Sequence, residues 1–187
     1  MEFAWRPGIG DPTFTGWLTV VFYLLAAGSS YATARLVSGT PPGPYGREIV
    51  VWHALAVLFL LLGINKQLDL QSALTEIGRL LAHHQGWYDR RDVVQLAFVG
   101  GVALVSALAG LGGMVLLRGV SLPTWIALLG AMIVLIFVVI RAASFHHVDV
   151  FIGSSFASIR WNAILEIGGL IVVLTGAWLR MLALRKR

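Results

Sequence analysis

Residues 48–65 read Glu-Ile-Val-Val-Trp-His-Ala-Leu-Ala-Val-Leu-Phe-Leu-Leu-Leu-Gly-Ile-Asn, an almost unbroken apolar run between a carboxylate and an amide. A bilayer core of about 30 Å is crossed by roughly 20 mostly apolar helical residues. This run therefore predicts a transmembrane helix. Runs of the same kind predict about five crossings in all, at residues 17–36, 48–65, 93–117, 123–145 and 161–182.

The composition supports the same class of protein. Of the 187 residues, 58% are hydrophobic and 12% are charged, which is outside the usual range of soluble domains. We expect an all-α polytopic membrane helix bundle that forms a single transmembrane domain over residues 1–187. The chain has no cysteine, which excludes disulfides, thiolate-held iron–sulfur clusters and cysteine-ligated zinc.

Basic residues flank the apolar runs, where they set topology and contact anionic lipid. The pattern predicts membrane lipids as partners and no nucleic acid. Lysines and arginines divide evenly between the two faces, so the tail Arg185-Lys186-Arg187 decides the orientation. A basic tail favours the cytoplasm. We expect an extracytoplasmic N-terminus and a cytoplasmic C-terminus.

The tryptophans lie near the ends of the apolar runs. Indoles prefer the membrane–water boundary, so the sequence predicts interfacial anchors on one face at Trp17, Trp87 and Trp161, and on the other at Trp52, Trp125 and Trp178. Small residues in the last run, Gly168, Gly169 and Gly176, predict close packing of that helix against a neighbour.

The connection between the second and third runs is amphipathic. Leu70, Leu74, Ile77 and Leu81 follow helical spacing, which predicts an interfacial helix over residues 70–87. It is followed by Arg90 and Arg91. These arginines are either solvated charges beside an aromatic anchor or ligands for the phosphate or carboxylate of a lipid headgroup.

Polar residues gather at the end of the bundle that carries the N-terminus. Glu166 lies about 9 Å deeper than Arg160 on one helix, inside the apolar zone, and a buried carboxylate needs compensation. An ion pair with Arg141, completed by Asn162, is the sharpest prediction. It would either lock two helices together or form the wall of a site. The other members of this predicted polar site are Lys66, Asn65 and Asp69.

Histidines form a second group at the same end. His146, His147 and Asp149 have a spacing that can present two ligands to one ion, with His83 or His84 as a third ligand. A bound transition metal, an interfacial hydrogen-bonding cluster and proton transfer all remain open. The pattern suggests a divalent transition metal as cofactor more than haem. His53 stands apart near the other end, and we expect it to be a hydrogen-bonded core histidine.

Three strings are similar to those of a group of small bacterial multi-spanning inner-membrane proteins: Gly63-Ile-Asn-Lys-Gln-Leu-Asp-Leu-Gln71, Gly86-Trp-Tyr88 with Arg90-Arg91, and Ser144-Phe-His-His-Val-Asp149. The resemblance implies a multi-pass protein of the bacterial inner membrane. It carries no established activity and therefore assigns no catalytic residue.

Three functions fit these patterns. The first is a binding or accessory protein, in which the polar site at the extracytoplasmic face holds a metal, a lipid or a quinone, or in which the bundle supports other membrane subunits. The second is a membrane-embedded enzyme, with or without a metal, that acts on a lipid-linked substrate. The third is passage of ions or protons along Arg141, Glu166 and His146. It has the fewest polar groups to carry it through the inner half of the bundle.

Overall fold

A computed structural model describes residues 11–39, 46–68, 117–143, 155–156 and 159–186, together with single residues at 77, 84 and 101. Side chains within the segments 140–143 and 155–163 are outside this description.

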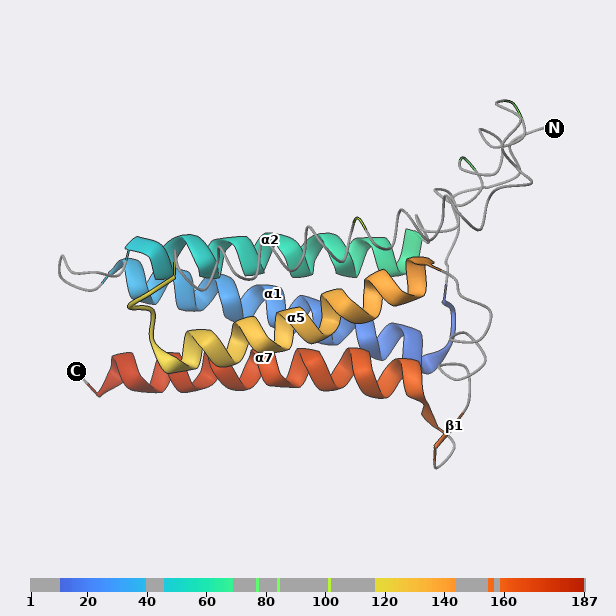
Figure 1. Ribbon diagram of the computed structural model, residues 1–187. Helices are drawn as coiled ribbons and strands as arrows, with labels where there is room; N and C mark the ends of the chain where they lie inside the picture. The colour runs from blue at the N-terminus through green and yellow to red at the C-terminus, as the bar shows by residue number, and fades with distance from the viewer. Residues whose placement is uncertain are drawn as a thin grey trace.

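Four helices in the described residues are long and apolar enough to cross a membrane. They are α1 (Phe14–Ser38), α2 (Gly46–Leu68), α5 (Leu122–Ala143) and α7 (Trp161–Arg185). A two-stranded antiparallel hairpin, β1 (Ser155–Phe156) with β2 (Ile159–Arg160), leads into α7 (Figure 1). The predicted class is therefore confirmed as an all-helical bundle with several apolar helices, and four predicted runs coincide with helices to within about three residues at each end.

Two of the predicted elements fall largely outside the described residues, namely the third apolar run at 93–117 and the interfacial helix at 70–87. The single described positions within them, Ile77, His84 and Gly101, are helical. The count of five crossings and the interfacial helix therefore stay predictions.

Local sequence explains where the helices begin. At the start of α1, Thr13 accepts the backbone N–H of Gly16 on its hydroxyl at 3.1 Å, and so satisfies one of the free amides of the first turn. Before α5, Gly119 adopts a φ of +92°, a conformation that costs glycine little. Pro123 then lies in the first turn of α5, where its missing N–H is not needed.

The helices form two hairpins that pack through α1 and α7. α1 packs against both α2 and α7, and α5 packs against α7. α1 and α7 run in one direction, whereas α2 and α5 run in the other (Figure 1). As a result, α2 and α5 begin at the same end of the bundle, while α2 ends where α1 and α7 begin.

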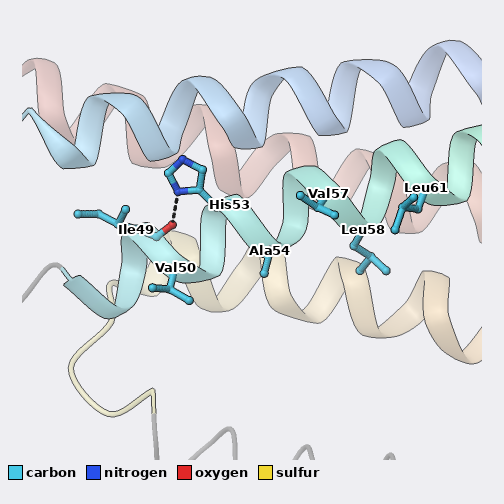
Figure 2. Close-up of a pocket in the computed structure, with 7 residues that line it drawn as sticks. All are labelled: Ile49, Val50, His53, Ala54, Val57, Leu58 and Leu61. Carbon is cyan, nitrogen blue, oxygen red and sulfur yellow. Dashed lines mark hydrogen bonds between the residues drawn. The ribbon is translucent and has the colours of Figure 1, made fainter.

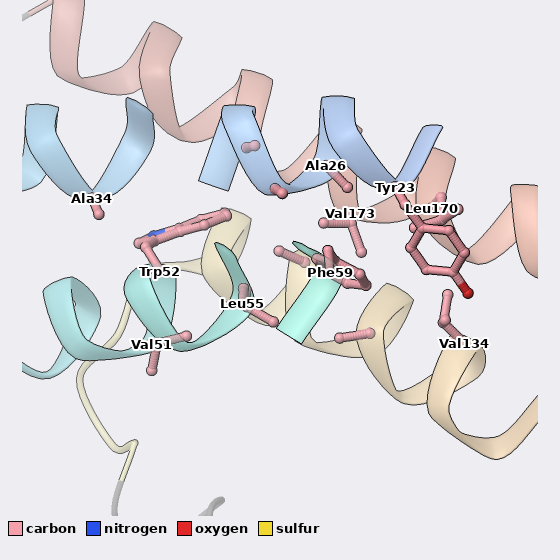
Figure 3. Close-up of a cluster of buried hydrophobic side chains, with 14 of the residues drawn as sticks. Tyr23, Ala26, Ala34, Val51, Trp52, Leu55, Phe59, Val134, Leu170 and Val173 are labelled. Atoms are coloured by element: carbon pink, nitrogen blue, oxygen red, sulfur yellow. The ribbon is translucent and has the colours of Figure 1, made fainter. Parts of the chain in front are cut away.

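Buried side chains fill the space between the helices (Figure 3). The largest are Trp52 and Phe59 from α2, Tyr23 from α1 and Leu170 from α7, each at most 1% exposed. Tyr23 and Phe59 pack with their ring centroids 6.4 Å apart. Because Trp52 is fully buried against α1, the prediction that it anchors the chain at the membrane surface is wrong. Trp17 and Trp178 are exposed, as an anchor requires.

Glycines bring α5 and α7 into close contact. A Cβ at Gly176 would lie 2.6 Å from the backbone nitrogen of Ala127, and one at Gly169 would lie 2.7 Å from a methyl of Val134. Gly130 on α5 meets α7 equally closely, at 2.7 Å from the carbonyl oxygen of Gly169. The prediction of close packing is right for Gly169 and Gly176. It is wrong for Gly168, which faces open space.

Candidate functional site

The end of the bundle where α2 finishes and α7 starts holds a buried ion pair. The Lys66 ammonium lies 2.9 Å from one carboxylate oxygen of Glu166, and the Glu166 side chain is 4% exposed. The other Glu166 oxygen accepts the hydroxyl proton of Tyr23 at 2.9 Å. Both carboxylate oxygens therefore have a donor, as a buried charge requires.

A second carboxylate approaches the same ammonium from the surface. Asp11 lies 3.9 Å from the Lys66 nitrogen, and its side chain is 32% exposed, against 11% for Lys66. Asp11 also accepts the backbone N–H of Thr13 at 3.3 Å, just before α1. We call Asp11, Tyr23, Lys66 and Glu166 the lysine cluster. Its formal charge is negative by one unit, because two carboxylates surround one ammonium.

The lysine cluster contains two of the predicted polar-site residues. The sequence prediction paired Glu166 with Arg141, whereas the described partners of Glu166 are Lys66 and Tyr23. The side chains of Arg141 and Asn162 lie outside the described residues, so their contribution stays a prediction. Asn65 is half-buried beside Lys66 on α2. Tyr23 was missed, because nothing in an apolar run indicates which of its tyrosines faces inward.

Most of the predicted metal and headgroup ligands lie outside the described residues, as does Asp69 of the predicted polar site; these ligands are Arg90, Arg91, His146, His147 and Asp149. His84 is described and is exposed. Among the described residues, no three histidine or carboxylate side chains come together in a group that could hold a metal ion. The metal site is therefore a prediction that rests on the remaining part of the chain.

A second buried cluster closes the opposite end of the bundle. Glu48 accepts the backbone N–H of Ser121 at 2.6 Å and the hydroxyl proton of Thr124 at 2.9 Å on one oxygen. Its other oxygen accepts a hydrogen bond from the guanidinium of Arg180. Glu48 is 2% exposed and Arg180 is 3% exposed. We call Glu48, Ser121, Thr124 and Arg180 the arginine cluster.

Sequence reasoning missed the arginine cluster. Both of its charges lie near the ends of apolar runs, where a glutamate or an arginine usually reaches the headgroups. The available signal was that Arg180 lies just inside the last predicted span at 161–182, where an ionisable residue calls for a partner.

Each of the two clusters pairs one charged residue of α2 with one of α7. Helix α2 gives Glu48 to one and Lys66 to the other, and α7 gives Arg180 to the first and Glu166 to the second. A neighbouring hydroxyl completes each cluster, from Tyr23 on α1 or from Thr124 on α5. Because α2 and α7 run in opposite directions (Figure 1), the two ion pairs fasten these helices to each other at both ends.

No protein-family model, curated protein or solved structure matches this chain. The two clusters differ in one respect that bears on function. The arginine cluster encloses its charges almost completely, whereas the lysine cluster has a partly exposed carboxylate, that of Asp11, at its edge.

Proposed function

We propose that this chain is a multi-pass membrane protein that works as a binding or accessory subunit, and that its ligand is an anionic lipid headgroup held at the lysine cluster. The observation that carries this proposal is the position of the Lys66 ammonium between a buried carboxylate at 2.9 Å and a partly exposed one at 3.9 Å. An ammonium has three donors. Glu166 takes one at hydrogen-bond distance, and Asp11 is too far away for a good hydrogen bond.

A phosphate or carboxylate can replace Asp11 on the outer side of Lys66, because Asp11 is partly exposed and its contact with the ammonium is long. Glu166 would stay in place, since Tyr23 holds its second oxygen. Headgroup oxygens are suited to this exchange because charge-assisted hydrogen bonds are shorter and stronger than neutral ones. Arg90, Arg91 and Arg141 are the predicted further cations of this site, and their presence would turn its net charge positive.

The proposal includes a fifth crossing and an orientation. Helices α2 and α5 begin at the same end of the bundle (Figure 1), where Arg47 donates a hydrogen bond of 3.2 Å to the carbonyl of Arg118. Because α2 ends at the opposite end, the chain between α2 and α5 has to cross back, which supports a fifth crossing. The basic tail supports a cytoplasmic C-terminus in the bacterial inner membrane, with the lysine cluster extracytoplasmic.

Native mass spectrometry of the protein, released from membranes in a mild detergent, tests the proposal. We expect the wild type to retain phosphatidylglycerol in preference to phosphatidylcholine. The double variant Lys66→Met/Glu166→Gln removes both buried charges together, which avoids an unpaired one, and should lose that preference. Lys186→Gln removes a lysine at the opposite end and should keep it. Equal retention by the wild type and the double variant would refute the proposal.

Metal analysis of the same preparation distinguishes the proposed binding function from the alternative of a metal-dependent enzyme. A stoichiometric transition metal that is lost on replacing His146 and His147 would favour the metal-dependent enzyme acting on a lipid-linked substrate. A metal-free protein that retains the anionic lipid supports the binding function.

A further inference from the structure

A groove runs along the face of α2 near the arginine cluster (Figure 2). It is shallow and largely open, with a volume of about 580 Å³, and its described lining residues all belong to α2. Apart from His53, the described residues that line it have aliphatic side chains, among them Val50, Ala54, Val57, Leu58 and Leu61. Because His53 is exposed in this groove, the prediction that it lies in the core is wrong, whereas the predicted hydrogen bond is present.

The hydrogen bond of His53 fixes which ring nitrogen is available. Its Nδ1 lies 2.9 Å from the carbonyl oxygen of Ile49. A carbonyl only accepts, so Nδ1 carries the proton and donates it. In the neutral ring, Nε2 then holds the lone pair and acts as an acceptor. The groove therefore presents a hydrogen-bond acceptor inside an apolar surface, and a ligand that uses it must bring a donor.

The second feature of the groove is an aromatic neighbour. The ring of Tyr31 on α1 meets the His53 ring edge to face, with the centroids 6.0 Å apart, and Tyr31 is 51% exposed. In Figure 2, His53 lies on the edge of the groove nearest α1. A flat headgroup held at His53 would therefore lie beside an exposed aromatic ring, which favours aromatic chemistry in the ligand.

The depth of the groove points to an amphiphile. His53 is seven residues from Gly46, the first residue of α2, and so about 10 Å below that end of the bundle. Leu61 lies about 12 Å further along the helix. A ligand with its headgroup at His53 would thus lay an apolar tail along Val57 and Leu61 towards the middle of the membrane.

We propose that this groove binds an isoprenoid quinol, with a quinol hydroxyl donating to Nε2 of His53 and the tail lying along α2. The oxidised quinone has only carbonyl acceptors, which would face the Nε2 lone pair without a hydrogen bond. The site therefore prefers the reduced form. A metal ion is a poorer fit, because the described lining residues add no second ligand to His53. The proposal does not depend on the lysine cluster, which lies at the opposite end of α2.

Binding of a short-chain ubiquinol and of the matching ubiquinone to the full-length protein in nanodiscs tests this proposal. We expect ubiquinol to bind roughly three- to tenfold more tightly, the value of one neutral hydrogen bond. His53→Phe should remove the difference, and Val57→Trp, which fills the groove from an exposed position, should abolish binding of both forms. His84→Phe replaces another exposed histidine and should change nothing.

The ¹⁵N shift of the His53 Nε2 gives a second readout that does not depend on affinity. It should move towards the hydrogen-bonded range on addition of ubiquinol and stay unchanged with ubiquinone. Equal affinity for the two forms, or a preference that survives in His53→Phe, would overturn the proposal. So would a wild type that binds neither form.

Discussion

Lys66 and Glu166 are separated by 100 positions in the chain, yet their charged atoms meet at 2.9 Å across the bundle. The pair is nearly enclosed and shares its carboxylate with Tyr23. A contact of this kind specifies how α2 and α7 align, because the described side chains of these two helices offer neither charge an equivalent partner if one helix shifts by a turn. Its arrangement underlies the first prediction.

Breaking the Lys66–Glu166 pair on one side should be costly. Among the described residues, Glu166→Leu leaves the buried Lys66 ammonium with the distant Asp11 alone, and we expect a loss of about 3 to 5 kcal/mol in the free energy of unfolding. Lys66→Met/Glu166→Leu should recover much of that loss, because no buried charge remains. Unfolding measurements in detergent give both values. If the double variant loses as much free energy of unfolding as Glu166→Leu and Lys66→Met lose together, the two side chains do not interact.

The hydroxyl in the arginine cluster can be tested without disturbing the ion pair. Thr124→Val keeps the shape of the side chain but removes the donor to Glu48, and hydrogen bonds to charged groups contribute about 1.5 to 3 kcal/mol. We expect destabilisation of that size. Thr175→Val removes an exposed hydroxyl whose partner among the described residues is the carbonyl of Ile171 on its own helix. It is the matched control and should have a much smaller effect.

The close contact between α5 and α7 predicts different outcomes for two glycines of one helix. Gly176→Ala would press a methyl group against the backbone of Ala127 and should cost about 1 to 3 kcal/mol. Gly168→Ala meets open space and should be neutral or slightly stabilising, since alanine favours the helix. Thermal unfolding of the two variants decides the matter, and equal effects would contradict the described packing.

The absence of native cysteines makes the topology directly measurable. Thr13→Cys lies at the start of α1 and Lys186→Cys follows α7, at opposite ends of the bundle (Figure 1). A membrane-impermeant maleimide added to intact cells should label the first variant and spare the second. Labelling of both from the same side would contradict the crossings, and the reverse pattern would invert the proposed orientation.

Sequence patterns predicted the apolar helices well because membrane crossing imposes a length and a composition that any single segment displays. They also identified Glu166 as a buried charge, since its depth follows from counting along one helix. Its partner depended on how separate helices align, which is why Lys66 was predicted at the same end and not in the pair. The sequence also did not predict which side of a helix each residue faces. Trp52 is buried and its neighbour His53 is exposed, and Gly169 contacts α5 while its neighbour Gly168 does not.

In the proposed function, the Lys66 ammonium binds an anionic headgroup when Asp11 moves aside. Asp11→Asn tests this exchange, because asparagine keeps an oxygen for the N–H and the hydroxyl of Thr13 while removing the competing charge. Native mass spectrometry should show more phosphatidylglycerol retained by Asp11→Asn than by the wild type, with phosphatidylcholine unchanged. Unchanged or reduced retention of phosphatidylglycerol would contradict the claim.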